Sequence, residues 1–274
     1  MQATAQTIEK AADHGLKPFI LGQLTSLGDA MQFTWQIILG MFTFFIKPPF
    51  EINEFLKQCY MLGNKTLGLV LVTGFIMGMV LTLQSRPVLA EFGAESWLPS
   101  MVSLSFLREI GPVITALICA GRIGSGIGAE VSSMKVTEQI EAMEVSATNP
   151  FRYIVVTRVL ACALMVPLLV VFSDVAGLVG SFASVNIYDS MSFPLFFVKS
   201  FASVDFMDLF PSIIKSVFFG LAIGIVGCYQ GYNAGKGTES VGAAANSAFV
   251  ISSLVVFFID LVAVQIVTLI HLFN

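Results

Sequence analysis

Residues Ser105 to Glu130 read SFLREIGPVITALICAGRIGSGIGAE, and this stretch sets the class of fold. It is long and apolar enough to cross a lipid bilayer as a helix, which takes roughly 20 mostly apolar residues. Yet Arg108 and Glu109 stand near its start, and Arg122 lies in its second half. Charges inside a span cost about 2.5–3.5 kcal/mol each on insertion scales, so they usually face a cavity or a partner. The stretch therefore predicts a membrane helix whose charged side chains face a cavity or a partner.

The composition of the whole chain points to the same class. Of 274 residues, 56% are hydrophobic and 12% are charged, and the mean hydropathy is +0.85. Soluble domains carry about a quarter charged residues and just under half apolar ones. The net charge of −4 gives nucleic-acid binding no electrostatic support. We expect an all-α integral membrane protein that binds no nucleic acid.

Five stretches are long enough to span a bilayer, and a sixth apolar stretch precedes them. The residues from Phe19 to Ile46 carry polar side chains at near-helical spacing on one side, which favours a helix in the membrane interface over a sixth span. We expect residues 1–50 to form a cytoplasmic segment with this helix and residues 51–274 to form a five-span domain. The expected spans are Thr66–Leu83 with an extension to about Phe92, Leu98–Glu130, Tyr153–Val185, Leu209–Tyr232 and Asn246–Leu272.

Lysine and arginine near the span ends predict the orientation. Placing the N-terminus inside puts most of these residues on the cytoplasmic side, including Lys65, Lys135 and Arg158, and leaves mainly Arg86 and Lys199 outside. We therefore expect a cytoplasmic N-terminus and a periplasmic C-terminus.

The chain shows no signature of catalysis or of a resident cofactor. Its four cysteines form no CxxC pair, and its two histidines lie near opposite ends of the sequence. The segment NAGKGTESVG departs from the phosphate-binding pattern GxxxxGK[ST], because Gly237 replaces the Ser or Thr. We expect no catalytic residue, no metal and no nucleotide in this chain.

Arg108 and Glu109 need partners within the membrane. Adjacent helix positions point about 100° apart, so the two cannot simply neutralise each other. Lys215 and Asp260 in later spans are candidate partners. The charges either form a structural ion-pair network or line a cavity for the headgroup of an amphiphile. A mainly apolar face at the outer end of the first span would complete such a cavity with Leu81, Gln84, Val88, Leu89 and Phe92.

Small residues crowd the second half of the same span. Gly121 and Ser125 stand four residues apart, as do Gly124 and Gly128. Such rows let helix backbones approach closely in lipid. Packing within the chain and contact between subunits are equally compatible with this pattern.

A short amphipathic helix is expected after Glu130. Thr137 is the expected N-cap, and Ile140 and Met143 lie on an apolar stripe away from the acidic residues. Because an acidic face is repelled by anionic lipid, the helix is expected to dock on protein, either a partner or the chain itself.

These motifs together resemble the MlaE/YrbE permease family from about Lys57 to Leu272. The resemblance rests on LREIGPV, AGRIG, TEQ, NPFRY and a central Asp260. It implies the permease subunit of an ABC-type transporter in the bacterial inner membrane that moves phospholipid to or from the outer membrane and maintains its asymmetry. It also implies a homodimer, two MlaF-like ATPases that bind ATP and Mg, a MlaB-like STAS-domain protein and a MlaD-like periplasmic ring of MCE domains.

The resemblance also assigns roles to residues. It implies a lipid pocket of Leu81, Gln84, Val88, Leu89, Phe92, Arg108, Glu109 and Ile110, an ATPase-coupling helix with Thr137, Glu138, Gln139, Ile140, Glu141 and Glu144, and a polar network of Asp208, Lys215 and Asp260. Phe92 departs from the tyrosine of some relatives, which removes a hydroxyl. The alternative function is an ion-coupled secondary transporter that uses Glu109, Lys215 and Asp260 as a proton relay.

Overall fold

The computed structural model describes residues 28–41, 51–188, 191–204 and 206–273, without the side chains of 188, 206–208 and 270–273. Regular structure in these residues is helical throughout. The chain divides into two units, Met1–Pro48 and Pro49–Asn274. In the first unit, residues 28–41 form a helix. Its location in the membrane interface stays a prediction, and the rest of the expected helix, 19–27 and 42–46, lies outside the described residues.

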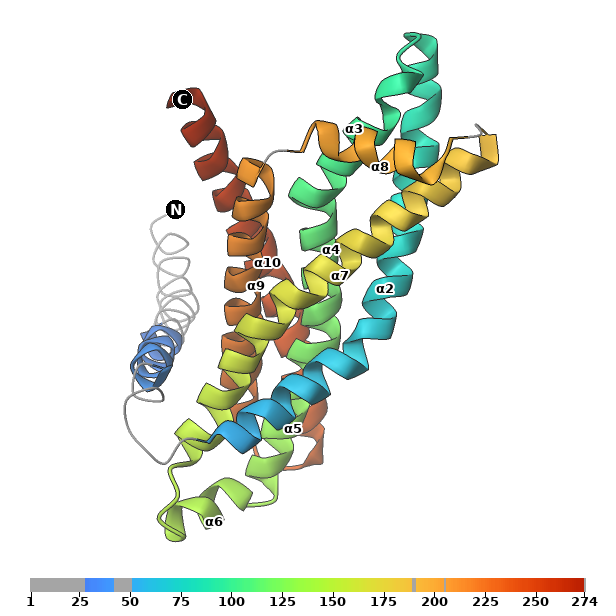
Figure 1. The fold of residues 1–274 in the computed structure, drawn as a ribbon. Coiled ribbons are helices and arrows are strands. Elements are labelled where there is room, and N and C mark those ends of the chain that lie inside the picture. Colours follow the sequence, from blue (N-terminus) through green and yellow to red (C-terminus); the bar gives the residue numbers. More distant parts are fainter. Residues whose placement is uncertain (1–27, 42–50, 189–190, 205, 274) are drawn as a thin grey trace, which may run out of the picture. The chain divides into compact units, whose positions relative to one another are not determined.

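The second unit contains five helical segments that are long and apolar enough to cross a membrane (Figure 1), which confirms the predicted number of spans. All five begin before the predicted residues, and the difference is largest for the first and the fifth, because polar residues extend these two helices beyond their apolar parts. The segments are α2 (Ile52–Glu91), the run Glu95–Val136, the run Phe151–Ile187, α9 (Phe206–Tyr232) and α10 (Thr238–Phe273).

The second of these segments, which holds the opening stretch, is continuous but not uniformly α-helical. A single 3₁₀ turn, η1 (Glu95–Trp97), precedes α3 (Leu98–Ser105), and π-helical turns η2 (Phe106–Ile110) and η3 (Ala120–Gly124) separate it from α4 (Gly111–Cys119) and α5 (Ser125–Val136). Pro112 explains η2, because its ring crowds the carbonyl group four residues earlier and it donates no hydrogen bond. That earlier residue is Arg108, so the sequence itself widens the helix at the charged pair.

The third segment packs closely against the first. It consists of a π-helical turn, η4 (Phe151–Val156), and α7 (Thr157–Tyr188). A Cβ atom added to Gly78 would overlap the backbone of Gly177, and one added to Gly180 would overlap the backbone of Phe75. The Ser181 hydroxyl also donates a hydrogen bond of 3.1 Å to the Gly78 carbonyl oxygen. Glycines therefore bring α2 and α7 to backbone contact, as small residues do in membrane proteins.

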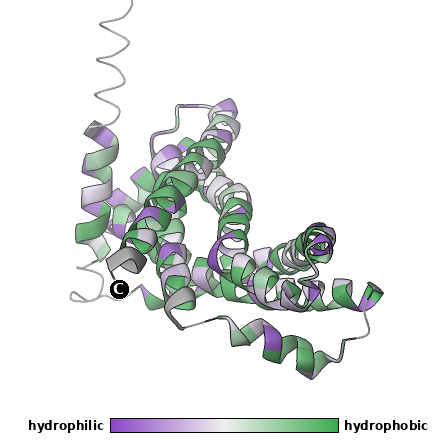
Figure 2. Cartoon of the chain, turned by 90° about the horizontal axis from the view of Figure 1, so that it is seen from above, coloured by the Kyte–Doolittle hydropathy of each residue, from purple (hydrophilic) through white to green (hydrophobic). Residues whose placement is uncertain are grey.

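The outer surface of the helices is apolar. Figure 2, which views the chain from above, shows many hydrophobic residues on the helices. Large apolar side chains such as Val72, Leu168 and Phe258 are exposed. In the most apolar part of α10, only 11% of the stretch is buried within the protein. A soluble protein rarely exposes so much apolar surface, whereas lipid solvates it without cost.

A short apolar helix, α8 (Phe193–Ala202), precedes α9 and was not predicted from the sequence. It lies beside α3 (Figure 1), and the Ser100 hydroxyl donates a hydrogen bond of 2.7 Å to the Lys199 carbonyl oxygen. Phe196 is fully buried and meets the ring of Phe182 edge-on at 5.5 Å. At 10 residues, α8 is too short to span a membrane, so it is not among the long apolar stretches that predict the spans.

The predicted amphipathic helix exists, but its start was predicted wrongly. Thr137 ends α5, where its hydroxyl donates to the Ser133 carbonyl oxygen at 2.8 Å. The helix itself is α6 (Gln139–Val145), and Glu138 precedes it with a positive φ of 58°. A threonine bonded back to the preceding helix cannot cap the following one, and this competition is invisible in the local sequence.

Candidate functional site

The charged site is built around Lys215 of α9. Its ammonium group donates to Glu109 Oε2 at 2.6 Å and to Asp260 Oδ1 at 3.1 Å, so one cation bridges two carboxylates. The Lys215 side chain is 6% exposed, whereas those of Glu109 and Asp260 are 46% and 20% exposed. This triad ties the second segment, α9 and α10 together, and both predicted partners of the charged pair lie within it.

Neighbouring contacts hold Lys215 in place. Ser212, three residues earlier on α9, donates a hydrogen bond of 2.9 Å to the Leu107 carbonyl oxygen. Both ends of this bond are beside triad residues, so it fixes how α9 faces η2. A buried ammonium group keeps its charge only when it is paired and hydrogen-bonded. The triad satisfies that condition.

A cavity of about 450 Å³ lies beside the triad. Arg108 and Glu109 form its charged part, while α10 contributes a mainly apolar wall. A second, smaller cavity shares Arg108 and Glu109 and reaches Lys215. The larger cavity is lined by Leu104, Ser105, Arg108, Glu109, Ile110, Val264, Val267 and Thr268. Charged and apolar walls on one cavity suit an amphiphile, whose head and tail need different surroundings.

The predicted pocket residues of α2 do not line this cavity within the chain. Leu81 and Leu89 pack against the buried cluster that contains Leu98 and Phe196. Gln84, Val88 and Phe92 are exposed, with Phe92 79% exposed. The structure therefore brings Arg108, Glu109 and Ile110 to the cavity and leaves the α2 face apart from it.

Asp208 lies in the first turn of α9, and its side chain is outside the described residues. The small residues of the second segment face other helices of the same chain. A Cβ atom built at each of three glycines would meet a side chain of α10. The distances are 3.6 Å from Gly121 to Phe249, 3.4 Å from Gly124 to Ser252 and 2.9 Å from Gly128 to Ala248. The Ser125 hydroxyl donates back to the Gly121 carbonyl oxygen within its own helix.

The predicted coupling residues lie around α6. Ile140 is buried, while Glu138, Gln139, Glu141 and Glu144 are exposed. Ile140 thus faces inward and the acidic side chains face outward, as expected from the spacing, whereas the apolar Val145 at the end of the helix is exposed.

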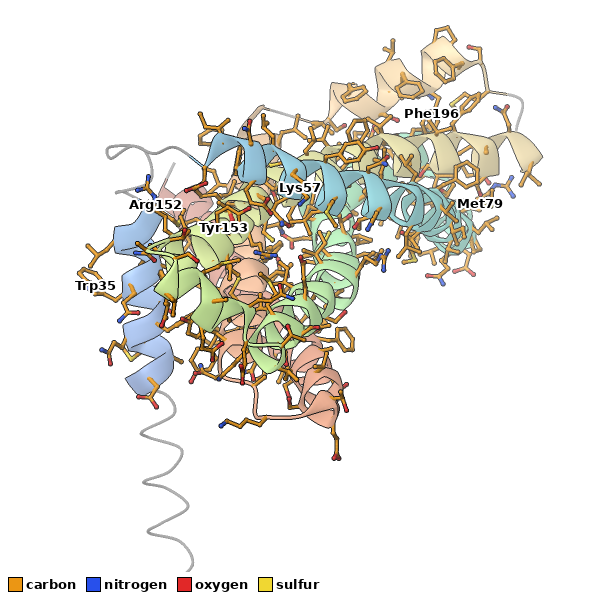
Figure 3. All side chains as sticks on the ribbon, turned by 90° about the horizontal axis from the view of Figure 1, so that it is seen from below. Trp35, Lys57, Met79, Arg152, Tyr153 and Phe196 are labelled. Carbon is orange, nitrogen blue, oxygen red and sulfur yellow. The ribbon has the colours of Figure 1, made fainter. Side chains whose placement is uncertain are left out.

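Three polar contacts join the helices at this end of the second unit. Lys135 of α5 donates to the Tyr232 carbonyl oxygen at 2.7 Å, and the buried Arg158 of α7 pairs with Glu130 of α5 at 2.8 Å. Figure 3 views this end, with Tyr153 lying toward the helix that carries Lys57, and the Tyr153 hydroxyl donates to Glu54 at 3.3 Å. The contacts of Lys135 and Arg158 therefore join α5, the helix that precedes α6, to α9 and α7.

Several residues of the site were not predicted from the sequence. Ser105 lies one helical turn before Glu109, and Val264 and Val267 lie one and two turns after Asp260. This helical spacing around the charged residues was the signal that could have found them. No comparable local signal marks Ser212, because its partner is 105 residues away in sequence.

The helices and the site define a class: a multi-pass membrane protein with a charged site between its spans. Residues 55–266, well over half of the chain, match the family described as Permease MlaE. The chain belongs to this family of ABC transporter permeases, a class whose subunits work with separate ATPase partners and are themselves typically not catalytic.

Individual relatives agree with this assignment. The chain is 38% identical to a probable ABC transporter permease protein of Rickettsia typhi, over 80% of this chain and 86% of the relative. It is 36% identical to a probable ABC transporter permease protein of Synechocystis, over 74% of this chain and 77% of the relative. It is also 36% identical to the intermembrane phospholipid transport system permease protein MlaE of Haemophilus influenzae, over 75% of this chain and 79% of the relative.

Proposed function

We propose that this chain is the permease of a transporter that moves phospholipid between the bacterial inner membrane and a periplasmic conduit of MCE domains, to or from the outer membrane, and so maintains outer-membrane asymmetry. Two copies form a homodimer with two MlaF-like ATPases, which bind ATP and Mg, and with a MlaB-like STAS-domain protein and a MlaD-like ring. The name of the Haemophilus influenzae relative supports the phospholipid substrate.

The observation that carries this proposal is the cavity beside the Lys215 triad. Arg108 provides a positive charge for a lipid phosphate, and Val264 and Val267 provide an apolar wall for acyl chains. In the homodimer, the exposed α2 face of Gln84, Val88 and Phe92 completes the chamber, and Leu81 and Leu89 support it from behind.

The orientation follows from the distribution of lysine and arginine. We place the N-terminus and α6 in the cytoplasm and the C-terminus in the periplasm. The exposed acidic side of α6 then faces the ATPases, and the contacts of Lys135 and Arg158 pass its movement to α7 and α9. ATP-driven closure of the ATPases shifts α6 and changes the width of the cavity.

Filling the cavity tests the lipid site. Val267→Trp places an indole in the cavity, while the matched control Leu261→Trp changes an exposed residue of the same helix, 57% exposed and outside the cavity lining. We expect the first variant, purified as the complex, to carry less phospholipid by mass spectrometry and the second to match the wild type. Equal lipid content in both variants would remove the cavity from the proposal.

Reversing charge on α6 tests the docking surface. Glu138→Lys with Glu141→Lys should reduce the ATPase that co-purifies with the permease. The matched control is Glu91→Lys with Glu95→Lys, two exposed carboxylates at the other end of the helices. Unchanged ATPase recovery with the α6 variant, at unchanged thermal stability, would show that ATPases dock elsewhere.

The ion-coupled alternative uses the same triad and makes a different prediction. ATP-driven transport continues in proteoliposomes when an uncoupler collapses the proton gradient, provided that ATP is present. A proton relay through Glu109, Lys215 and Asp260 would stop under those conditions. Lipid movement that depends on the gradient and not on ATP contradicts the proposal.

A further inference from the structure

A third cavity lies between α2 and the second segment, nearer to the α6 end. Its volume is about 190 Å³, and its lining combines Lys65 and Arg122 with the apolar side chains of Met61, Leu62 and Ile123. Glu130 also lines it. Arg122 follows Glu109 by 13 residues, which is ~20 Å along a helix. The cavity is thus separate from the one beside the triad.

The two cations in this cavity form no ion pair within the part of the chain that the structure describes. Glu130 is already paired, because its Oε1 accepts a hydrogen bond of 2.8 Å from the buried Arg158. No described carboxylate forms an ion pair with Lys65 or Arg122. Two like charges on one cavity repel, and an anion between them would replace that repulsion with attraction.

The cavity lies where the apolar part of α2 begins. Lys65 immediately precedes the apolar run Thr66–Leu83, so its side chain reaches the depth at which lipid phosphates lie. Gly126 adds open space on the facing helix, since a Cβ atom built there meets nothing within 4 Å. A basic pocket between membrane helices at this depth is the usual form of a site for anionic lipid headgroups.

We propose that this cavity binds the phosphate of an anionic phospholipid, with Lys65 and Arg122 donating hydrogen bonds to its oxygens. Met61 and Leu62 then contact the glycerol and the first part of the acyl chains. A soluble phosphate shares the charged chemistry but would leave this apolar wall unused, so a lipid is the favoured source. This proposal holds whichever substrate the protein transports. A lipid bound here would stabilise the contact between α2 and the second segment without being transported.

Native mass spectrometry of the full-length protein in detergent tests the proposal, with phosphatidylglycerol and phosphatidylethanolamine as probes. We expect tighter binding of phosphatidylglycerol to the wild type. Lys65→Gln and Arg122→Gln should each weaken it about fivefold, the effect of one cation at a membrane surface. Lys57→Gln is the matched control, because Lys57 is on the same helix, 65% exposed, and already paired with Glu54 at 3.7 Å.

Gly126→Leu provides an independent variant that keeps both charges. Leucine favours a helix over glycine, so the fold is retained while its side chain enters the open space. This variant should lose phosphatidylglycerol selectivity while its Tm stays at or above that of the wild type. Its result keeps the proposal testable even if removal of a cation lowers expression.

Three results would overturn the proposal. The first is unchanged phosphatidylglycerol binding in the Lys65→Gln/Arg122→Gln double variant, or an equal loss in Lys57→Gln. The second is displacement of the lipid by millimolar inorganic phosphate, which would make the site one for a soluble anion. The third is loss of the co-purified ATPase from the double variant with unchanged lipid binding, which would assign the two cations to a protein interface.

Discussion

Replacing Lys215 by methionine removes the cation that bridges two carboxylates. Methionine has a similar length and keeps the apolar contacts of the lysine stem. Glu109 and Asp260 then lose their common partner, which lies 2.6 and 3.1 Å from their oxygens. Two uncompensated carboxylates remain between the second segment, α9 and α10.

The expected loss follows from the burial of the three groups. Removing one partner of a buried ion pair costs about 3–5 kcal/mol. Glu109 is 46% exposed, so solvent screens part of its charge and the lower end of that range applies. A loss of about 3 kcal/mol lowers Tm by roughly 6–12 °C in a domain of this size.

A thiol-reactive fluorophore provides the assay, because all four cysteines are buried and react only on unfolding. The triple variant Lys215→Met/Glu109→Gln/Asp260→Asn removes all three charges and should recover most of the lost Tm, since no uncompensated carboxylate remains. Lys57→Met, which removes an exposed lysine, should stay within about 2 °C, as surface pairs contribute 0–1 kcal/mol. If Lys215→Met melts with the wild type, or the triple variant is no more stable than the single one, the triad does not stabilise the fold.

Three further predictions concern packing, a second ion pair and the assay itself. Gly78→Ala should destabilise the protein by about 1–3 kcal/mol through overlap with α7, whereas Gly68→Ala, which faces open space, should be neutral or stabilising by chemical denaturation. Glu130→Ala should lower Tm more than Arg158→Met, since the first leaves a cation that is 3% exposed and the second leaves a carboxylate that is 45% exposed. Val145→Cys, at a residue 90% exposed, should label in minutes in the folded protein while the native thiols stay unlabelled by mass spectrometry.

The spans were predictable because a bilayer imposes one requirement on each of them separately. Apolar runs such as Thr66–Leu83 satisfy it by length and composition alone, and all five lie in helices. The helix boundaries were less predictable, since α2 begins at Ile52 and α10 at Thr238, where hydrogen bonding within the helix continues past the apolar residues.

Short elements were harder to predict. The hydroxyl of Thr137 bonds back into α5 instead of capping α6. The helix α8 is held by Ser100 and by the packing of Phe196, and both contacts come from distant parts of the chain. Local propensity is weak in elements this short, so tertiary contacts decide their ends.

By itself, the sequence determined that this protein is helical, spans a membrane five times and carries charges that need partners in lipid, because helix geometry and the cost of an unpaired charge act residue by residue. Only the tertiary structure decided that Lys215 pairs with both Glu109 and Asp260, that the α2 face lies apart from the cavity beside them, and that Lys65 and Arg122 line a separate cavity. Those outcomes depend on which helix faces which. The glycines of α2 and α7 allow two helices to approach closely, but they do not determine which helix becomes the neighbour.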